Sequence, residues 1–174
     1  DEHFSKFRLS DALMTLYKFF WDDFCAWYLE VIKPEYGKPI DKVTYDATIV
    51  FFEKLLRLLH PIMPFITEEL WQNIEERKAG ETIMLQPMPK AGEYSVETIH
   101  AFEQGVGAIA SIRNIRQSKG LSPKEALTLQ IKGAFPEKIV SVVKRMANLS
   151  EVSIVENIDN SANGAAFMVD TIEF

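Results

Sequence analysis

Three cations that lie close together in this sequence of 174 residues have the chemistry and the spacing to contact phosphate groups. Arg113 and Arg116 are three residues apart, so a helix would place them on one face, with Lys119 about one turn further along. A guanidinium donates paired hydrogen bonds to a phosphate, so two neighbouring arginines can hold neighbouring phosphates. The same arginines could instead pair with glutamates or with carbonyl groups at a helix end, and the sequence leaves both alternatives open.

The charge of the chain is unevenly distributed, which bears on any contact with a nucleic acid. The chain has 19 basic and 25 acidic residues, and its net charge of −6 argues, taken as a whole, against a nucleic-acid partner. Residues 105–150, however, contain eight basic residues and only two acidic ones. Because charges are screened over about 8–10 Å at physiological salt, such a basic face can still attract phosphate. The alternative for these basic residues is a solvated helix face. Lys33 and Lys18 are secondary candidates for phosphate contacts.

Three aromatic residues near the end of the first apolar segment are candidates for stacking on unpaired bases. These are Trp27, Tyr28 and Tyr36. An exposed aromatic ring that stacks on a single-stranded base contributes about 1–3 kcal/mol. Aromatic residues at helical spacing are more often core residues, and we expect this role for Trp21 and Phe24 and, unless it protrudes, for Trp27.

No combination of residues in the sequence predicts an active site or a metal site. The three histidines, His3, His60 and His100, are far apart and do not have the spacing of metal ligands. Cys25 lies on an apolar helix face, which favours an inert buried thiol, and a single cysteine excludes an internal disulfide. No glycine-rich loop of the kind that cradles phosphates follows a strand. We therefore expect no catalytic residue, no metal and no cofactor in this chain.

Hydrophobic periodicity predicts that helices position these side chains. Apolar residues recur at three- and four-residue steps over residues 10–33, 41–60, 67–78 and 95–120, which is typical of helices with buried faces. Helices are expected to begin where a side chain can cap the first N–H groups, and to end before proline or glycine. The expected first residues are Ser10 with Asp11, Asp41 or Thr44, Thr67, and Ser95.

After Leu121 the periodicity changes to the alternation that is typical of strands. The expected segments are strands at 126–132, 151–156 and 165–172, a short helix at 136–147, and a turn at Asn163-Gly164. The sequence thus predicts a mainly α fold, with a helical domain over residues 1–120 and a small α+β domain of order β-α-β-β over residues 121–174. Gly105 and Gly107, inside the last long helix, indicate close packing of that helix.

The sequence also favours a soluble, cytoplasmic protein. No apolar run approaches the ~20 residues that a membrane helix needs. The opening residues Asp1 and Glu2 begin no signal peptide. We expect a monomer with no membrane contact.

Two stretches of the chain are distinctive enough to indicate a family. Residues 20–30 read Phe-Trp-Asp-Asp-Phe-Cys-Ala-Trp-Tyr-Leu-Glu, and residues 58–71 read Leu-Leu-His-Pro-Ile-Met-Pro-Phe-Ile-Thr-Glu-Glu-Leu-Trp. Together they closely resemble the anticodon-binding helical domain of class I aminoacyl-tRNA synthetases. The second stretch is shared with the leucyl and isoleucyl relatives. The first stretch, and Ile-Arg-Asn-Ile-Arg at residues 112–116, resemble the valyl branch.

The resemblance implies an antiparallel helical bundle that binds the anticodon arm of a tRNA, in the valyl branch a valine-specific one. Such a domain positions the tRNA for ATP-dependent aminoacylation but does not catalyse that reaction itself. The parent protein would be an enzyme, a ligase of protein biosynthesis. ATP and magnesium would bind to its catalytic domain, which this chain lacks.

Three features depart from the family pattern. Ala26 stands where the family usually has an acidic residue, so alanine cannot make any polar contact that the acid makes there. The catalytic domain with the helix that follows it, and the C-terminal coiled coil of valyl enzymes, are not in this sequence, which therefore resembles an excised piece. The alternatives are a helical protein-interaction module that docks a partner helix, the equivalent domain of an isoleucyl or leucyl enzyme, and a small enzyme in its own right.

Overall fold

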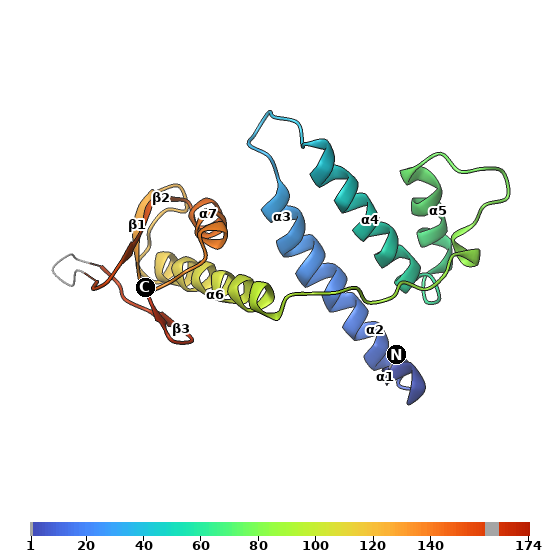
Figure 1. Ribbon diagram of the computed structural model, residues 1–174, viewed down its shortest axis with the longest axis horizontal. Coiled ribbons are helices and arrows are strands. Elements are labelled where there is room, and N and C mark those ends of the chain that lie inside the picture. The colour runs from blue at the N-terminus through green and yellow to red at the C-terminus, as the bar shows by residue number, and fades with distance from the viewer. Residues whose placement is uncertain (1, 159–163) are drawn as a thin grey trace. The chain divides into compact units, whose positions relative to one another are not determined.

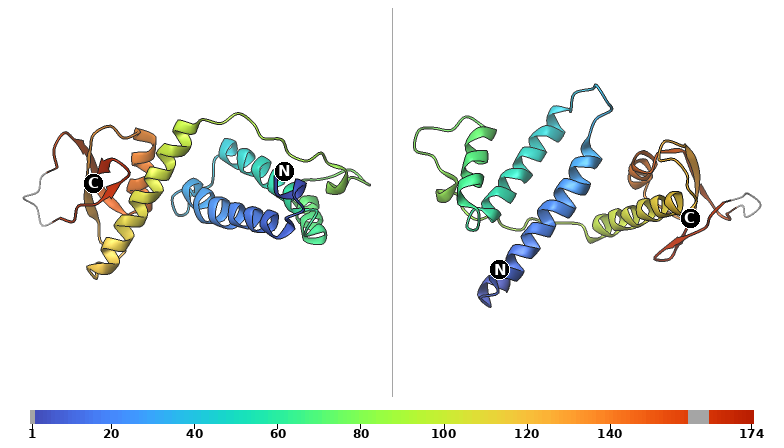
Figure 2. Two further views of the ribbon diagram at one scale, coloured as in Figure 1. Left: turned by 90° about the horizontal axis from the view of Figure 1, so that it is seen from below. Right: turned by 180° about the vertical axis from the view of Figure 1, so that it is seen from behind.

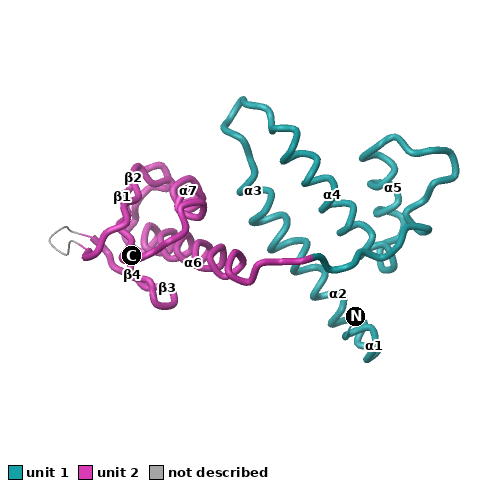
Figure 3. Tube along the Cα trace, in the orientation of Figure 1, with its two compact units in different colours: residues 1–92 teal, residues 93–174 magenta. Residues whose placement is uncertain are grey.

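The computed structural model describes residues 2–158 and 164–174. The chain forms two compact units, residues 1–92 (unit 1) and residues 93–174 (unit 2), which are coloured separately in Figure 3. The two units differ in architecture, because unit 1 is helical whereas unit 2 combines helices with a sheet. The chain as a whole is therefore mainly α with a small β portion, as the sequence predicts.

Unit 1 begins with a long helical rod that the sequence predicts as one helix. After the short α1 (Glu2–Ser5), the segments α2 (Leu9–Lys18), η1 (Phe19–Tyr28) and α3 (Leu29–Ile32) follow one another without a break. The middle segment, η1, has the wider turn of a π-helix, a geometry that is rare and often found at functional sites. The expected helix at residues 10–33 is thus confirmed, with an unexpected change of pitch.

The rod packs on α4 (Lys42–Leu59), which runs back alongside it, and α5 (Pro64–Ile74) and the 3₁₀ turn η2 (Ile83–Leu85) follow (Figure 1). Phe24 is buried, and its ring stacks on Phe52 of α4 with the ring centroids 5.9 Å apart. Trp71 is buried beside Leu56. Trp21 remains 57% exposed, so its assignment to the core is wrong for this unit. Its ring stacks on that of Tyr17, one turn earlier in the rod, with the centroids 6.3 Å apart.

The sequence predicts the start of α4 correctly and the start of α5 wrongly. Asp41 caps α4, since its carboxylate accepts a hydrogen bond of 2.9 Å from the N–H of Thr44. Thr67 was expected to cap α5, and this is wrong because α5 already begins at Pro64, whose fixed φ suits the first helical position. Thr67 is buried instead, and its hydroxyl lies 2.7 Å from Nδ1 of His60.

Unit 2 contains a four-stranded sheet and two helices that cover one of its faces (Figure 2). The elements are α6 (Val96–Ser118), β1 (Leu127–Lys132), α7 (Glu137–Met146), β2 (Leu149–Val155), β3 (Met168–Val169) and β4 (Ile172–Glu173). The sheet order is β2-β1-β4-β3, with β1 parallel to β2 and antiparallel to β4. The expected β-α-β-β order is present, with the last strand divided into β3 and β4. The turn expected at Asn163-Gly164 includes Asn163, which lies outside the described residues.

The two glycines of α6 pack as closely as the sequence predicts. A Cβ atom added to Gly105 would lie 2.6 Å from Cγ2 of Ile139 in α7, and one added to Gly107 would lie 2.8 Å from Cγ1 of Val169 in β3. Because α6 buries its apolar face against α7 and the sheet, it belongs to unit 2. The compact units therefore divide between residues 92 and 93, whereas the sequence suggests a domain boundary at residue 120.

Candidate nucleic-acid interface

Arg116 is the most deeply buried of the predicted phosphate contacts, with 5% of its surface exposed. Its Nη1 donates to the carbonyls of Ser122 and Glu125 at 2.9 and 2.7 Å. Its Nη2 donates to the carbonyls of Ala147 and Asn148 at 3.0 and 3.1 Å. The alternative stated from the sequence, an arginine that binds carbonyl groups at helix ends, describes these contacts. Arg116 thus ties the end of α6 to the end of α7.

Arg113 lies one turn earlier on α6 and is exposed. Its Nη2 donates to the carbonyl of Met146, the last residue of α7, at 3.3 Å. Lys144 and Arg145 belong to the last turn of α7, so Arg113 brings a third cation to the same helix end. Carbonyl oxygens carry no net charge, so the bond to Met146 does not cancel the charge of the guanidinium. Sequence reasoning did not select Lys144 and Arg145, although the basic balance of residues 105–150 includes them.

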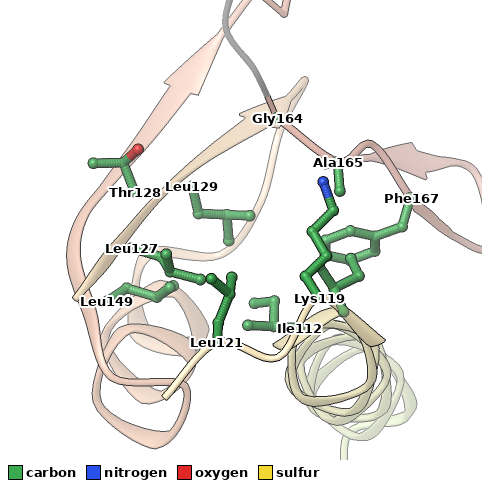
Figure 4. Close-up of a pocket in the computed structure, with 11 residues that line it drawn as sticks. Ile112, Lys119, Leu121, Leu127, Thr128, Leu129, Leu149, Gly164, Ala165 and Phe167 are labelled. Atoms are coloured by element: carbon green, nitrogen blue, oxygen red, sulfur yellow. The ribbon is translucent and has the colours of Figure 1, made fainter. Parts of the chain in front are cut away.

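Lys119 follows the last turn of α6 and stands at the edge of a hollow in unit 2 (Figure 4). This cavity of about 270 Å³ lies between α6 and the strands β1 and β2. Its other lining side chains are almost all apolar, among them Leu121, Leu129 and Phe167. Lys119 is exposed and is the one charged residue among the described residues that line this cavity.

The three candidate stacking rings in unit 1 differ in how much of their surface is exposed. Tyr36 is fully exposed in the loop between α3 and α4. Tyr28 is partly buried, with its ring stacked on Phe24 at 5.4 Å and its hydroxyl within 3.1 Å of Thr48 Oγ1. Trp27 is half-buried. Tyr36 is therefore the ring with the most open surface, and Tyr28 is held rigidly.

The two secondary cations also lie in unit 1. Lys33, the residue after α3, is exposed and forms an ion pair with Glu30 one turn earlier. Lys18, the last residue of α2, is exposed. The predicted cations and rings are thus divided between the units. Arg113, Arg116 and Lys119 belong to unit 2, and the remaining candidates belong to unit 1.

Unit 1 also contains a cavity of about 630 Å³ that the sequence did not indicate. It lies between η1, α4 and the segment 89–92, and Asp23 and Lys54 are among its lining residues. Partial burial raises the pKa of the Asp23 carboxyl, and the neighbouring Asp22 raises it further. Burial also raises the pKa of the Cys25 thiol, which keeps the thiol protonated and agrees with the inert role expected for it.

Comparison with known proteins identifies the family. Residues 1–131 match the family described as the anticodon-binding domain of tRNA ligase. The chain belongs to this family. The resemblance found in residues 20–30 and 58–71 is thereby confirmed.

Relatives of this anticodon-binding domain are valine–tRNA ligases. The enzyme of Parabacteroides distasonis is 49% identical over 174 residues, which are 100% of this chain and 20% of the relative. The enzyme of Porphyromonas gingivalis is 47% identical over 174 residues, and that of Christiangramia forsetii is 38% identical over 177 residues. Both matches cover 100% of this chain and 20% of the relative. The chain therefore spans about a fifth of the length of these relatives. The matches confirm the valyl branch and do not favour a protein-interaction module.

Neither a metal-binding cluster nor a membrane-spanning helix is found in the part of this anticodon-binding domain that the structure describes. Within residues 2–158 and 164–174, no three His, Cys, Asp or Glu side chains are grouped so that they could hold a metal ion. Among the same residues, no helix combines the length and the apolar character that crossing a membrane requires.

Proposed function

We propose that this domain belongs to a valine–tRNA ligase and binds the anticodon arm of valine tRNA. The observation that carries the proposal is the 49% identity with a valine–tRNA ligase over the entire chain, together with the family match. By binding the arm, the domain would orient the tRNA so that its acceptor end reaches a catalytic site elsewhere in the parent polypeptide. Correct and incorrect tRNAs would be distinguished by how well each supports this placement.

The reaction itself is assigned to the parent enzyme and not to this domain. A valine–tRNA ligase would use ATP, with magnesium, to activate valine and then transfer it to the tRNA. No residue of this chain is assigned to ATP, magnesium or valine. We further infer that the parent works in the cytoplasm and that it is a monomer. Sedimentation of the purified enzyme tests the monomeric state.

The exposed cations near the ends of α6 and α7 are the proposed phosphate contacts. Arg113, Lys144 and Arg145 share one helix end, and Lys119 ends the neighbouring helix. Lys33 and Lys18 are the corresponding candidates in unit 1, and Tyr36, with Trp27 and Tyr28 behind it, is the candidate for stacking on a loop base. Arg116 acts by positioning, since its four carbonyl bonds fix the two helix ends that carry the other cations.

A binding titration over several salt concentrations tests this function. We expect the chain to bind a valine tRNA transcript more tightly than the same transcript with an altered anticodon. The logarithm of the affinity should fall with the logarithm of the salt concentration by about 0.7–0.9 per phosphate contact. Equal affinity for the two transcripts at every salt concentration would contradict recognition of the anticodon.

A further inference from the structure

The cavity in unit 2 has apolar walls and one charged group (Figure 4). It has a volume of about 270 Å³ and lies between α6 and the strands β1 and β2. Ile112, Leu129 and Leu149 line it, and only 4%, 8% and 7% of their surfaces are exposed. All its described lining residues belong to unit 2, so the cavity is a feature of one compact unit. Water finds few hydrogen-bond partners along such walls, so the cavity favours an apolar ligand.

Phe167 forms a flat wall of this cavity and is fixed by the core of unit 2. Its ring stacks on that of Phe174, with the centroids 5.1 Å apart. The two residues also exchange both of their backbone hydrogen bonds, at 3.0 and 2.9 Å. Phe174 is itself buried and meets Phe135 edge to face at 5.8 Å. The wall is therefore preformed, and a ligand loses little free energy in ordering it.

Lys119 brings a positive charge to these apolar walls. Figure 4 shows its side chain beside Phe167, across the cavity from Leu127 and Leu149. Lys119 is exposed, and in the described part of the chain its ammonium takes part in no hydrogen bond or ion pair. Arg116, one turn earlier on the same helix, instead donates to four carbonyl groups. The ammonium of Lys119 is therefore available to an anionic ligand.

This combination selects a ligand with one anionic end and an apolar chain. An ammonium group donates strong, charge-assisted hydrogen bonds to a carboxylate. No acidic side chain is among the described residues that line the cavity, so a cationic ligand would be repelled by Lys119 and attracted by nothing. A methylene group occupies about as much space as a water molecule, whose share of the liquid is about 30 Å³. The cavity thus has room for a chain of about eight carbon atoms.

We propose that this cavity binds an aliphatic carboxylate of up to about eight carbon atoms. The chain packs against Phe167 and the leucines of β1 and β2, and the carboxylate accepts hydrogen bonds from Nζ of Lys119. The inference goes beyond the proposed function, because this ligand is not a tRNA and has no ammonium group, unlike valine. Lys119 is also a proposed phosphate contact, so a bound carboxylate would occupy an ammonium that the RNA backbone could otherwise use.

The experiment titrates the 174-residue chain with butyrate, hexanoate and octanoate by calorimetry at constant ionic strength. Each methylene group that becomes buried should strengthen binding about fourfold, so octanoate should bind roughly 200-fold more tightly than butyrate. Octylamine has the same chain with the opposite charge. We expect it to bind at least about tenfold more weakly than octanoate, because only the carboxylate is held by a charge-assisted hydrogen bond.

Two lysine variants test the role of the ammonium. With Lys119→Met, which keeps an unbranched side chain and removes the charge, the preference for octanoate over octylamine should fall to about one. Lys124→Met is the matched control, because Lys124 is an exposed lysine of unit 2 that does not line the cavity. It should leave the preference at about tenfold or more.

Two tryptophan variants test whether the chain enters the cavity. Ala165 is exposed and lines the cavity, so an indole ring at this position would compete with the ligand for the same space. Ala165→Trp should therefore weaken the binding of octanoate at least about tenfold. Ala166→Trp is the matched control, since Ala166 is equally exposed but does not line the cavity. Circular dichroism verifies that all four variants retain the fold.

The inference is overturned if affinity does not rise from butyrate to octanoate, or if octanoate and octylamine bind equally well. It is also overturned if Lys119→Met and Lys124→Met, or the two tryptophan variants, behave alike. These titrations contain no RNA, so their failure leaves the proposed function intact. Conversely, a chain that does not distinguish tRNA transcripts can still bind octanoate, and the two proposals therefore fail separately.

Discussion

The two units carry similar net charge but use their cations differently. Unit 1 has 11 basic and 15 acidic residues, and unit 2 has 8 and 10. In unit 1 many cations form ion pairs with nearby carboxylates: Lys6 with Glu2, Lys33 with Glu30, Lys38 with Glu35, Lys42 with Asp46, and Arg77 with Glu53. In unit 2 all basic residues lie between Arg113 and Arg145. Lys132 forms an ion pair with Glu173, whereas both arginines of α6 donate to carbonyl groups, which carry no net charge.

This difference suggests a division of work within one anticodon-binding domain. Unit 2 concentrates positive charge at the ends of two helices, which suits attraction of the RNA backbone regardless of sequence. Unit 1 has much of its charge paired locally and offers the candidate stacking rings instead, which suits the reading of a base. Variants in each unit test this division, and the unit that a variant affects can be identified because Trp21, Trp27 and Trp71 all lie in unit 1.

The largest effect is expected from Arg116→Ala. The change removes a donor from four carbonyl groups of unit 2, of which only that of Ser122 also accepts from a backbone N–H, that of Glu125, among the hydrogen bonds of the described residues. We therefore expect the free energy of unfolding of unit 2 to fall by about 3 kcal/mol. Circular dichroism should register this loss. The unfolding transition of unit 1, followed by tryptophan fluorescence, should stay as in the parent chain. Arg116→Lys, with fewer donors, should be intermediate. A variant that unfolds normally but binds tRNA poorly would instead make Arg116 a phosphate contact.

The next largest effect concerns affinity. Replacing Arg113, Lys144 and Arg145 together by alanine should weaken tRNA binding at physiological salt about tenfold. It should also lower the salt slope by about 0.7–0.9 for each phosphate that these cations no longer neutralise. Lys42→Ala serves as the control, because Lys42 pairs with Asp46 in unit 1 and should leave the slope unchanged. A full salt slope in the triple variant would place the phosphate contacts elsewhere.

Gly105→Ala should produce a smaller loss, confined to unit 2. The added methyl group would lie 2.6 Å from Cγ2 of Ile139, and such overpacking costs about 1–3 kcal/mol, of which better helix propensity returns about 1 kcal/mol. Gly92→Ala, whose Cβ would meet no atom within 4 Å, should unfold like the parent chain. Denaturant titrations followed by circular dichroism compare the two. Equal stability would show that α6 and α7 are not in close contact.

The smallest effect is a pH dependence in unit 1. Glu68 accepts hydrogen bonds from Thr82 Oγ1 at 2.6 Å, from Gln72 and from the N–H of Ile83, and these bonds, chiefly that of Thr82, lower its pKa. A carboxyl with a lowered pKa stabilises the fold above its unfolded pKa of about 4.3, and this contribution is lost as the pH falls through the folded value.

Glu68→Gln should therefore flatten the fall in the stability of unit 1 below about pH 5. Tryptophan fluorescence in denaturant, recorded from pH 3 to pH 7, measures it. An unchanged pH profile would exclude Glu68 as a source of the dependence.

The sequence predicted local features well and spatial relations poorly. The helices, the start of α6 at Ser95 and the packing of Gly105 could be predicted, because periodicity, caps and a glycine inside a helix are local signals. Arg113 and Arg116 look alike in sequence, and only the carbonyls of Ala147 and Asn148, more than thirty residues away, distinguish the buried one.

The cavity of unit 1 could not be predicted from the sequence either, because it also depends on contacts between distant segments. Asp23, Phe51 and Lys90 come from three separate segments, and no spacing in the sequence indicates that they share one hollow. The assignment of α6 to unit 2 likewise depends on α7 and the sheet, which follow it in the chain.

Competition between the two ends of a tRNA tests whether this domain binds the anticodon arm. A labelled valine tRNA bound to the 174-residue chain is titrated with its unlabelled anticodon stem-loop or, separately, with a hairpin of its acceptor arm. We expect the anticodon stem-loop to displace the tRNA at concentrations where the acceptor hairpin has no effect. Equal displacement by both RNAs, or displacement by the acceptor hairpin alone, would contradict it.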